Sequence, residues 1–248
     1  MTKILLLDIE TAPNLGYFWR IWKENIGTNQ IVNNGSVLSW AAKWVGEKDM
    51  MFGAKWKDGE KKMLARIHRL LNETDIVVHY NGKSFDIPTL NKEFIIHGFP
   101  PPAPYKQVDL LLVVRDTFAF VSRKLDYVTK TLGMGQKVRH PGFELWVKAM
   151  GGDPAAQRHM ERYNRRDVVL LEKLYLRLRP WIKGHPNVGV LGDISSCPNC
   201  GSTHFQRRGT AVATLLKYHR YQCQNCATWF RGTKAINNTQ RERFTGIA

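Results

Sequence analysis

Short apolar runs early in the chain predict the buried strands of a central sheet. Residues 4–10 read ILLLDIE, and residues 36–45 and 49–53 continue as two further strands of a meander. Residues 75–80 (DIVVHY) form another apolar run, which ends at the turn-forming pair Asn81-Gly82. The pattern therefore predicts several buried strands within the first 80 residues.

Segments with helical periodicity lie between and after these strands. Residues 60–72 carry apolar side chains at helical spacing, and residues 88–97 begin with a proline in the first turn and are followed by a glycine. Residues 110–120 and 125–132 are predicted to form further short helices. Strands that alternate with helices predict the α/β class, with a mixed central sheet flanked by helices.

A stretch rich in glycine, residues 184–192, predicts a linker, because the composition changes there. We therefore expect a domain over residues 1–183, a small module over residues 193–234, and a basic, polar tail over residues 235–248. No apolar run is long enough to span a bilayer and no secretion signal is present. We expect a cytoplasmic protein without a membrane partner.

The charge of the chain favours a polyanionic partner. Its 37 Lys and Arg residues outnumber 21 Asp and Glu residues, which gives a net charge of +16, and both predicted parts are basic. Such an excess is most often associated with nucleic acid, with an ordinary basic enzyme as the alternative. The hydrophobic content of 43% excludes a wholly disordered chain.

Carboxylates occupy positions where the apolar pattern predicts a buried face. Alternation along a strand places Asp8 and Glu10 on one side. In the helix that follows Pro154, Asp167 interrupts an apolar stripe, and Tyr163 lies one turn earlier on the same face. Buried carboxylates need a shared proton or a cation, and Mg²⁺ prefers carboxylate oxygens. The alternatives are solvated loop acids for the strand pair and a structural ion pair for Asp167.

Two further acids lie near predicted strand ends. Asp86 closes the segment NGKSFD, at the edge where α/β sheets usually bind ligands, although acids are also common at helix entries. Asp109 is either an auxiliary ligand or a helix cap.

Aromatic residues follow the first acidic pair closely. Tyr17, Phe18, Trp19 and Trp22 lie within a short segment after Glu10. We expect them to belong to the core, because large aromatic side chains are usually buried. Stacking on nucleic-acid bases is the alternative.

Two CxxC pairs predict one structural Zn²⁺ ion. Cys197 and Cys200 are separated by 22 residues from Cys223 and Cys226, and the remainder of the chain has no cysteine. Four thiolates form a closed zinc site that adds folding energy to a segment too small for its own core. Redox-active or idle cysteines are the alternative.

Cations and aromatic residues alternate around the cysteines, a composition that suits a single nucleic-acid strand. An acidic protein partner is the competing interpretation. The candidate nucleic-acid contacts in this part of the chain are Arg207, Arg208, Lys217, Arg220 and Arg231.

Three of these segments together resemble a known family. The sequences Asp8-Ile-Glu10, NGKSFD at 81–86 and Tyr163-Asn-Arg-Arg-Asp167 resemble, in order, the three motifs of the tyrosine subclass of DEDD-superfamily 3′–5′ exonucleases. The histidine subclass would need a histidine where this chain has Arg162. The wider sequence, including Lys124-Leu-Asp-Tyr127, is similar to phage and bacterial exonuclease-like proteins that end in a zinc ribbon.

The resemblance implies an RNase H-like fold and a two-metal phosphodiesterase site. The implied catalytic residues are Asp8, Glu10, Asp86, Tyr163 and Asp167. The four carboxylates would hold two Mg²⁺ or Mn²⁺ ions, and the tyrosine would orient the attacking water. Lys83 and Lys124 are candidate contacts to the scissile phosphate, with ordinary surface lysines as the alternative.

The expected substrate is single-stranded DNA, with RNA a close second, and the expected partners are replication, repair or recombination proteins. A structure-specific endonuclease would use the same metals with another path for the strand. A nucleic-acid-binding zinc-ribbon protein without catalysis is the alternative from another functional class.

Overall fold

The structure, a computed structural model, describes residues 2–192, 195–213 and 215–236. The chain divides into two compact units, one formed by Lys3–Tyr175 and the other by Thr2 with the described residues from Leu176 onward. The domain boundaries expected from the sequence stay predictions. From residue 237 on, the predicted tail lies outside the described residues.

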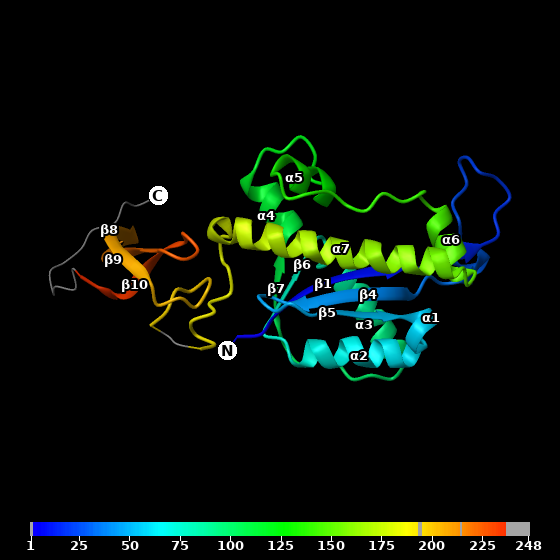
Figure 1. The fold of residues 1–248 in the computed structure, drawn as a ribbon, viewed down its shortest axis with the longest axis horizontal. Coiled ribbons are helices and arrows are strands. Elements are labelled where there is room, and N and C mark those ends of the chain that lie inside the picture. The colour runs from blue at the N-terminus through cyan, green and yellow to red at the C-terminus, as the bar shows by residue number, and fades with distance from the viewer. Residues whose placement is uncertain (1, 193–194, 214, 237–248) are drawn as a thin grey trace. The chain divides into compact units, whose positions relative to one another are not determined.

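A five-stranded mixed sheet forms the centre of the first unit (Figure 1). Its order is β5-β4-β1-β6-β7, with β1 antiparallel to β4 and parallel to β6. The strands are β1 (Ile4–Thr11), β4 (Val37–Trp44), β5 (Met50–Ala54), β6 (Ile76–His79) and β7 (Lys106–Asp109). The apolar runs predicted four of them. For the edge strand β7 the sequence indicated only a strand end near Asp109, because the first two residues of β7 are polar and exposed.

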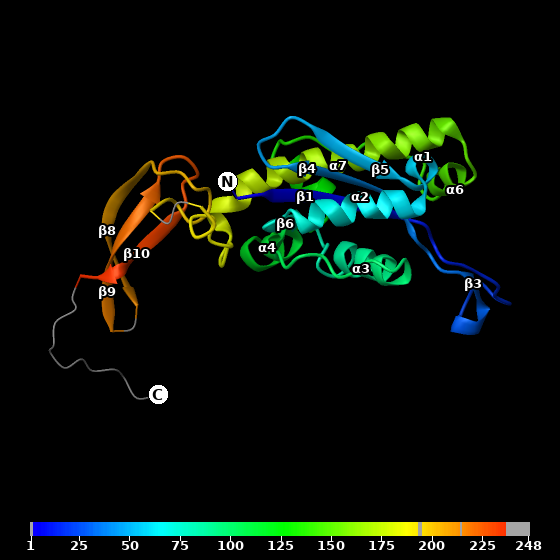
Figure 2. The same ribbon diagram turned by 90° about the horizontal axis from the view of Figure 1, so that it is seen from below.

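Helices cover both faces of this sheet, as Figures 1 and 2 show together. On one face, α2 (Glu60–Asn72) and α3 (Asp86–Ile96) pack against Leu5, Leu7 and Ile9 of β1 in one apolar core. On the other face lies α7 (Pro154–Leu178), whose Met160 packs with Leu38 of β4. The predicted mixed α/β architecture is confirmed.

The long helix α7 buries the stripe that the sequence predicted. Met160, Tyr163, Asp167, Leu171, Leu174 and Leu178 are all buried. Four shorter helices complete the first unit: α1 (Lys55–Asp58), α4 (Leu110–Thr117), α5 (Leu125–Thr131) and α6 (Glu144–Met150). Over the part of the chain that the structure describes, no helix combines the length and apolar character needed to cross a bilayer.

Residues 15–33 leave the sheet between β1 and β4 as an extension that we call the arm. At its base β2 (Leu15–Gly16) pairs with β3 (Ile31–Asn33), and the short 3-10 helix η1 (Thr28–Gln30) precedes β3. The expectation that its aromatic residues belong to the core is wrong. Tyr17, Phe18, Trp19 and Trp22 are all exposed, because none of the segments that the structure describes forms a second layer over this two-stranded ribbon.

The second unit contains a three-stranded antiparallel sheet of order β10-β9-β8. Its strands are β8 (Phe205–Ala213), β9 (Leu216–Cys223) and β10 (Trp229–Ala235), and the short 3-10 helix η2 (Arg179–Trp181) precedes them. The rings of Phe205, Tyr221 and Phe230 contact one another across the three strands.

Candidate active site

Three carboxylates from two elements meet on the face of the sheet that α7 covers. Asp8 and Glu10 extend from β1, and Asp167 extends from the middle of α7, with one carboxylate oxygen of each within 4.8 Å of the others. Because β1 continues to Thr11, the alternative of solvated loop acids is excluded. The strand pairing shifts register between Glu10 and Thr11, so the strand bends directly after the acidic pair.

Burial and mutual repulsion raise the pKa values of this group. Burial first, and then the charge of Asp167, raises the pKa of Glu10 to about 8. The same causes hold the pKa of Asp8 well above its usual range. Oδ1 of Asp167 is buried, and no described residue forms a hydrogen bond with it. The cluster gathers negative charge and has an unused oxygen, which a hard divalent cation would neutralise and bind.

Asp86 joins the group from the first turn of α3. Its Oδ1 accepts a hydrogen bond of 3.1 Å from the backbone N–H of Ile9, which lies between the two acids of β1. Burial raises the pKa of Asp86 to about 6, and its charge adds to the raised pKa of Asp8. Asp86 therefore lies beside the three-carboxylate cluster.

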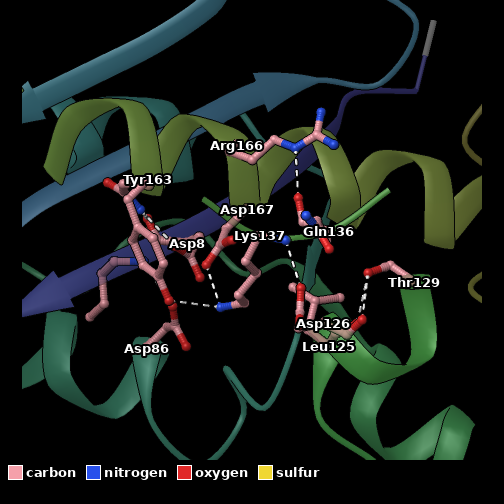
Figure 3. A network of polar contacts seen from close by, with 12 residues as sticks. Asp8, Asp86, Leu125, Asp126, Thr129, Gln136, Lys137, Tyr163, Arg166 and Asp167 are labelled. Atoms are coloured by element: carbon pink, nitrogen blue, oxygen red, sulfur yellow. Dashed lines mark hydrogen bonds and ion pairs between the residues drawn. The ribbon is translucent and has the colours of Figure 1, made fainter. Parts of the chain in front are cut away.

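A lysine that the sequence patterns did not single out contacts the cluster directly. Nζ of Lys137 lies 2.5 Å from Oδ2 of Asp167 and 3.0 Å from the hydroxyl oxygen of Tyr163 (Figure 3). The ion pair that we kept as the alternative for Asp167 is thus present. It uses one oxygen of that carboxylate, and within the described ranges Oδ1 stays without a partner.

The loop that carries Lys137 is fastened at two points. The backbone N–H of Lys137 donates to Oδ1 of Asp126 at 2.6 Å, and Nε of Arg166 donates to the carbonyl oxygen of Gln136 at 3.1 Å. Figure 3 shows both contacts beside the acidic cluster. The loop has no periodic pattern, so nothing in the sequence indicated where its lysine would lie.

Tyr163 presents its hydroxyl group to the cluster. Burial, followed by the charge of Asp167, raises its pKa to about 12, so the phenol stays protonated at neutral pH. Its ring meets those of His140 and Trp146 edge to face, at centroid distances of 5.0 and 6.1 Å. These contacts fix the direction in which the hydroxyl points.

Asn164 is a second residue that the sequence reasoning missed. Its Nδ2 donates to Oδ2 of Asp8 at 2.6 Å, and its Oδ1 accepts from the Ser39 hydroxyl at 3.2 Å. The asparagine is fully buried and so links α7, β1 and β4 at the site. Its position next to Tyr163 in the third motif was the sequence feature that could have indicated a role at the site.

Asp109 caps a helix. Its carboxylate accepts hydrogen bonds from the backbone N–H groups of Leu111, Asn81 and Lys83, at 3.0, 2.8 and 3.2 Å. The first of these bonds is the N-cap of α4. The structure therefore favours the cap interpretation over that of an auxiliary ligand.

The candidate nucleic-acid contacts all lie at the surface, and their binding role stays a prediction. The exposed residues are Lys83, Lys124, Arg207, Arg208, Lys217, Arg220 and Arg231. Within the described part of the chain, Lys137 is the lysine that pairs with the acidic cluster, whereas Lys83 and Lys124 form no ion pair.

The four cysteines of the second unit converge. One Sγ atom of each lies within 4.8 Å of the others, and the pairs Cys197–Cys226 and Cys200–Cys223 are both 3.7 Å apart. A tetrahedral zinc site with Zn–S bonds of about 2.3 Å has S–S edges of about 3.8 Å. A hydrogen bond from the Cys200 thiol lowers the pKa of Cys226 to about 4, which favours a thiolate. The cluster fits a zinc ribbon.

Comparison with known proteins agrees with this fold. The chain is similar to a family B DNA polymerase from the hyperthermophilic archaeon Pyrobaculum calidifontis, with 21% sequence identity and a TM-score of 0.55. The match covers 73% of this chain and 25% of the polymerase chain, so the protein spans about a quarter of that relative. No curated protein matches the chain. The family model of the RNase_H superfamily matches residues 43–179, more than half of the sequence. The chain belongs to the RNase_H superfamily.

Proposed function

We propose that this protein is a metal-dependent 3′–5′ exonuclease that hydrolyses the phosphodiester bonds of single-stranded nucleic acid. The observation that carries the proposal is the approach of Asp8, Glu10 and Asp167 within 4.8 Å in a fold of the RNase_H superfamily. In the proposed site these three acids would hold one divalent ion, and Asp8 with Asp86 would hold the other. Carboxylate oxygens are the ligands that Mg²⁺ and Mn²⁺ prefer.

The protein's own residues prepare the site for hydrolysis. Bound divalent ions would lower the pKa of the attacking water and neutralise charge on the phosphate. Asn164 holds Asp8 in place through a hydrogen bond of 2.6 Å. Tyr163 stays protonated and orients water by hydrogen bonding, and Lys137 supplies a positive charge that can contact the phosphate.

The direction of digestion and the substrate rest on the motif set. Asp8-Ile-Glu10, the segment 81–86 and Tyr163-x3-Asp167 resemble 3′–5′ exonucleases of the tyrosine subclass, which supports removal of nucleotides from the 3′ end. Single-stranded DNA is the preferred substrate, with RNA second. The expected cytoplasmic location and the expected replication, repair or recombination partners stay predictions.

The second unit is proposed to grip the strand. Residues 195–236 contain six Lys and Arg residues and no Asp or Glu. Arg220 and Arg231 are opposite each other in β9 and β10 and therefore share one face of the sheet. Their guanidinium groups lie 4.9 Å from the ring centre of Trp229 and 3.9 Å from that of Tyr218. Two cations beside the exposed Trp229 ring suit the phosphates and bases of a single strand.

Linear and circular strands test the proposal. We expect Mg²⁺ or Mn²⁺ to support stepwise shortening of a 5′-labelled linear strand from its 3′ end, no cleavage of a circular strand, and no cleavage in EDTA. Cleavage of the circle would instead indicate an endonuclease. Binding without cleavage in either metal would indicate a binding protein. DNA and RNA strands of the same sequence compare the two substrates.

A further inference from the structure

The arm is short and exposes many large apolar side chains. Trp19 is 94% exposed, Trp22 82% and Tyr17 79%. The other exposed apolar residues of the arm are Leu15, Phe18, Ile21, Ile26 and Val32. An exposed cluster of this kind on a soluble domain marks a binding surface.

Polar contacts give the arm a defined shape without covering its rings. The carboxylate of Glu24 accepts hydrogen bonds from the backbone N–H groups of Trp19 and Arg20. The Gln30 side chain bridges the two halves, because its Oε1 accepts from the Gly27 N–H at 2.7 Å and its Nε2 donates to the Tyr17 carbonyl oxygen at 3.1 Å. The backbone is therefore held while the rings point outward.

The charges of the arm favour a polyanion. The one carboxylate, that of Glu24, is engaged by backbone N–H groups. The two cations, Arg20 and Lys23, are exposed and form no ion pair with any residue that the structure describes. A purely apolar protein surface would have to desolvate both cations, which is costly. A single nucleic-acid strand matches both features, since its phosphates pair with cations and its bases stack on rings.

Aromatic side chains also connect the arm with the acidic cluster. A hollow of about 630 Å³ is lined by Leu15 at the base of the arm and by Phe143, and a second hollow of about 380 Å³ is lined by Phe143, His140 and Trp146. His140 and Trp146 contact the ring of Tyr163, whose hydroxyl group faces the carboxylates. Figures 1 and 2 both show the arm and α6 at the same end of the unit.

We infer that the arm and this aromatic path form a stacking track for the bases of a single strand whose 3′ end lies at the carboxylates. Bases near the scissile phosphate stack on Trp146 and Phe143, and bases farther upstream stack on the rings of Tyr17, Trp19 and Trp22. The inference rests on the proposed function, because it takes the carboxylates as the place where the 3′ end lies. It adds a length requirement, since only a strand of several nucleotides reaches the arm.

Three double variants of Trp19 and Trp22 separate stacking from simple apolar contact. The pair Trp19→Phe and Trp22→Phe keeps aromatic faces, the pair of leucine substitutions keeps apolar area only, and the pair of alanine substitutions keeps neither. Binding of a labelled strand of about 20 nucleotides is measured by fluorescence anisotropy without Mg²⁺ or Mn²⁺. We expect the phenylalanine pair to bind within about threefold of the wild type, and the leucine and alanine pairs to bind about tenfold or more weakly.

Cleavage of a dinucleotide is the matched control, because a dinucleotide cannot reach the arm. Its kcat/KM should be unchanged in all three double variants, whereas KM for the long strand should rise in the leucine and alanine pairs. Equal binding by all the variants would overturn the inference. Two results would show that the arm binds an apolar protein surface instead. One is retained strand binding by the leucine pair, and the other is self-association that depends on the rings while strand binding is unaffected.

The design keeps failure of the inference apart from failure of the proposed function. Anisotropy requires no cleavage, so the arm is tested even if no nuclease activity exists. Cleavage of both substrates with no effect of the ring substitutions would overturn the stacking track and leave the exonuclease proposal standing. The substituted tryptophans are exposed, so thermal melting should be unchanged and serves as the control for folding.

Discussion

Lys137 places its ammonium group 2.5 Å from the Asp167 carboxylate, beside the acids that we propose as metal ligands. The lysine comes from the loop between α5 and α6, 30 residues before its partner in the chain. Its charge partly offsets the raised pKa values of Asp8 and Glu10. A divalent ion bound by Asp167 must therefore share that carboxylate with Lys137 or displace it.

Replacing Lys137 by methionine tests this competition. The variant Lys137→Met removes the charge and keeps most of the length of the side chain, so Mn²⁺ should bind about tenfold more tightly, since a charge-assisted hydrogen bond no longer competes. Titration calorimetry with Mn²⁺ measures the affinity. Lys124→Met, which removes an exposed lysine without an ion pair, is the control. An unchanged Mn²⁺ affinity in Lys137→Met would show that the lysine and the metal do not compete.

Asn164 should control the position of Asp8. The variant Asn164→Ala removes the donor to Oδ2 of Asp8, and we expect the cleavage rate to fall about 10- to 100-fold, as for other residues that orient metal ligands. Ser39→Ala removes only the bond that orients Asn164 and should have a smaller effect. Single-turnover cleavage at saturating Mg²⁺ provides the comparison. Wild-type rates in Asn164→Ala would exclude the positioning role.

Stability without divalent ions should decrease as the pH rises. The folded protein holds protons on Glu10, with a pKa of about 8, and on Asp86, with a pKa of about 6, whereas unfolded carboxyl groups titrate near 4. Between about pH 4 and pH 8 the folded state binds more protons than the unfolded state, so the free energy of unfolding falls on the order of a few kcal/mol.

Urea unfolding between pH 5 and pH 8.5, followed by tryptophan fluorescence, checks this expectation. Saturating Mg²⁺ should reduce or reverse the trend, because the ion favours the ionised carboxylates. Glu73→Gln, which removes an acid of an exposed ion pair outside the cluster, is the control variant. Asp126 also lies outside the cluster, but it is unsuitable as a control because its carboxylate holds the Lys137 loop. Stability that rises with pH in the absence of divalent ions would contradict the raised pKa values.

The cysteine cluster should hold one zinc ion per chain. Cys223→Ser removes a buried ligand, and we expect loss of zinc and of the three-stranded sheet, since binding energy of a structural zinc is folding energy. Atomic absorption and circular dichroism measure these changes. His204→Ala should retain zinc, because His204 is not part of the cluster. A Cys223→Ser protein with full zinc content would contradict the assignment.

Periodic features were predictable from the sequence, whereas contacts made by loops were not. The alternation in β1 placed Asp8 and Glu10 on one face, and the 3.6-residue period of α7 placed Asp167 on a buried stripe. Lys137 reaches the site from a loop without a period, through anchors that only the folded chain brings together. Its position could therefore not be predicted from the sequence pattern.

For the arm, the sequence led to a wrong prediction rather than to a missing one. Its aromatic composition is typical of a core, so the sequence predicted burial for Trp19 and Trp22. Burial requires a second layer of structure, and the arm has a two-residue strand paired with a three-residue strand at its base. Composition describes the side chains, but the surrounding topology decides whether they are covered.

Cleavage by the variant Asp167→Asn tests the central claim most directly. The substitution keeps the size of the side chain and removes the carboxylate that joins α7 to Asp8 and Glu10. Wild-type protein should shorten a labelled single strand in Mg²⁺, and Asp167→Asn should cleave at least about 100-fold more slowly while binding the strand with unchanged affinity. Mg²⁺-dependent cleavage by Asp167→Asn at the wild-type rate would contradict the proposed metal site.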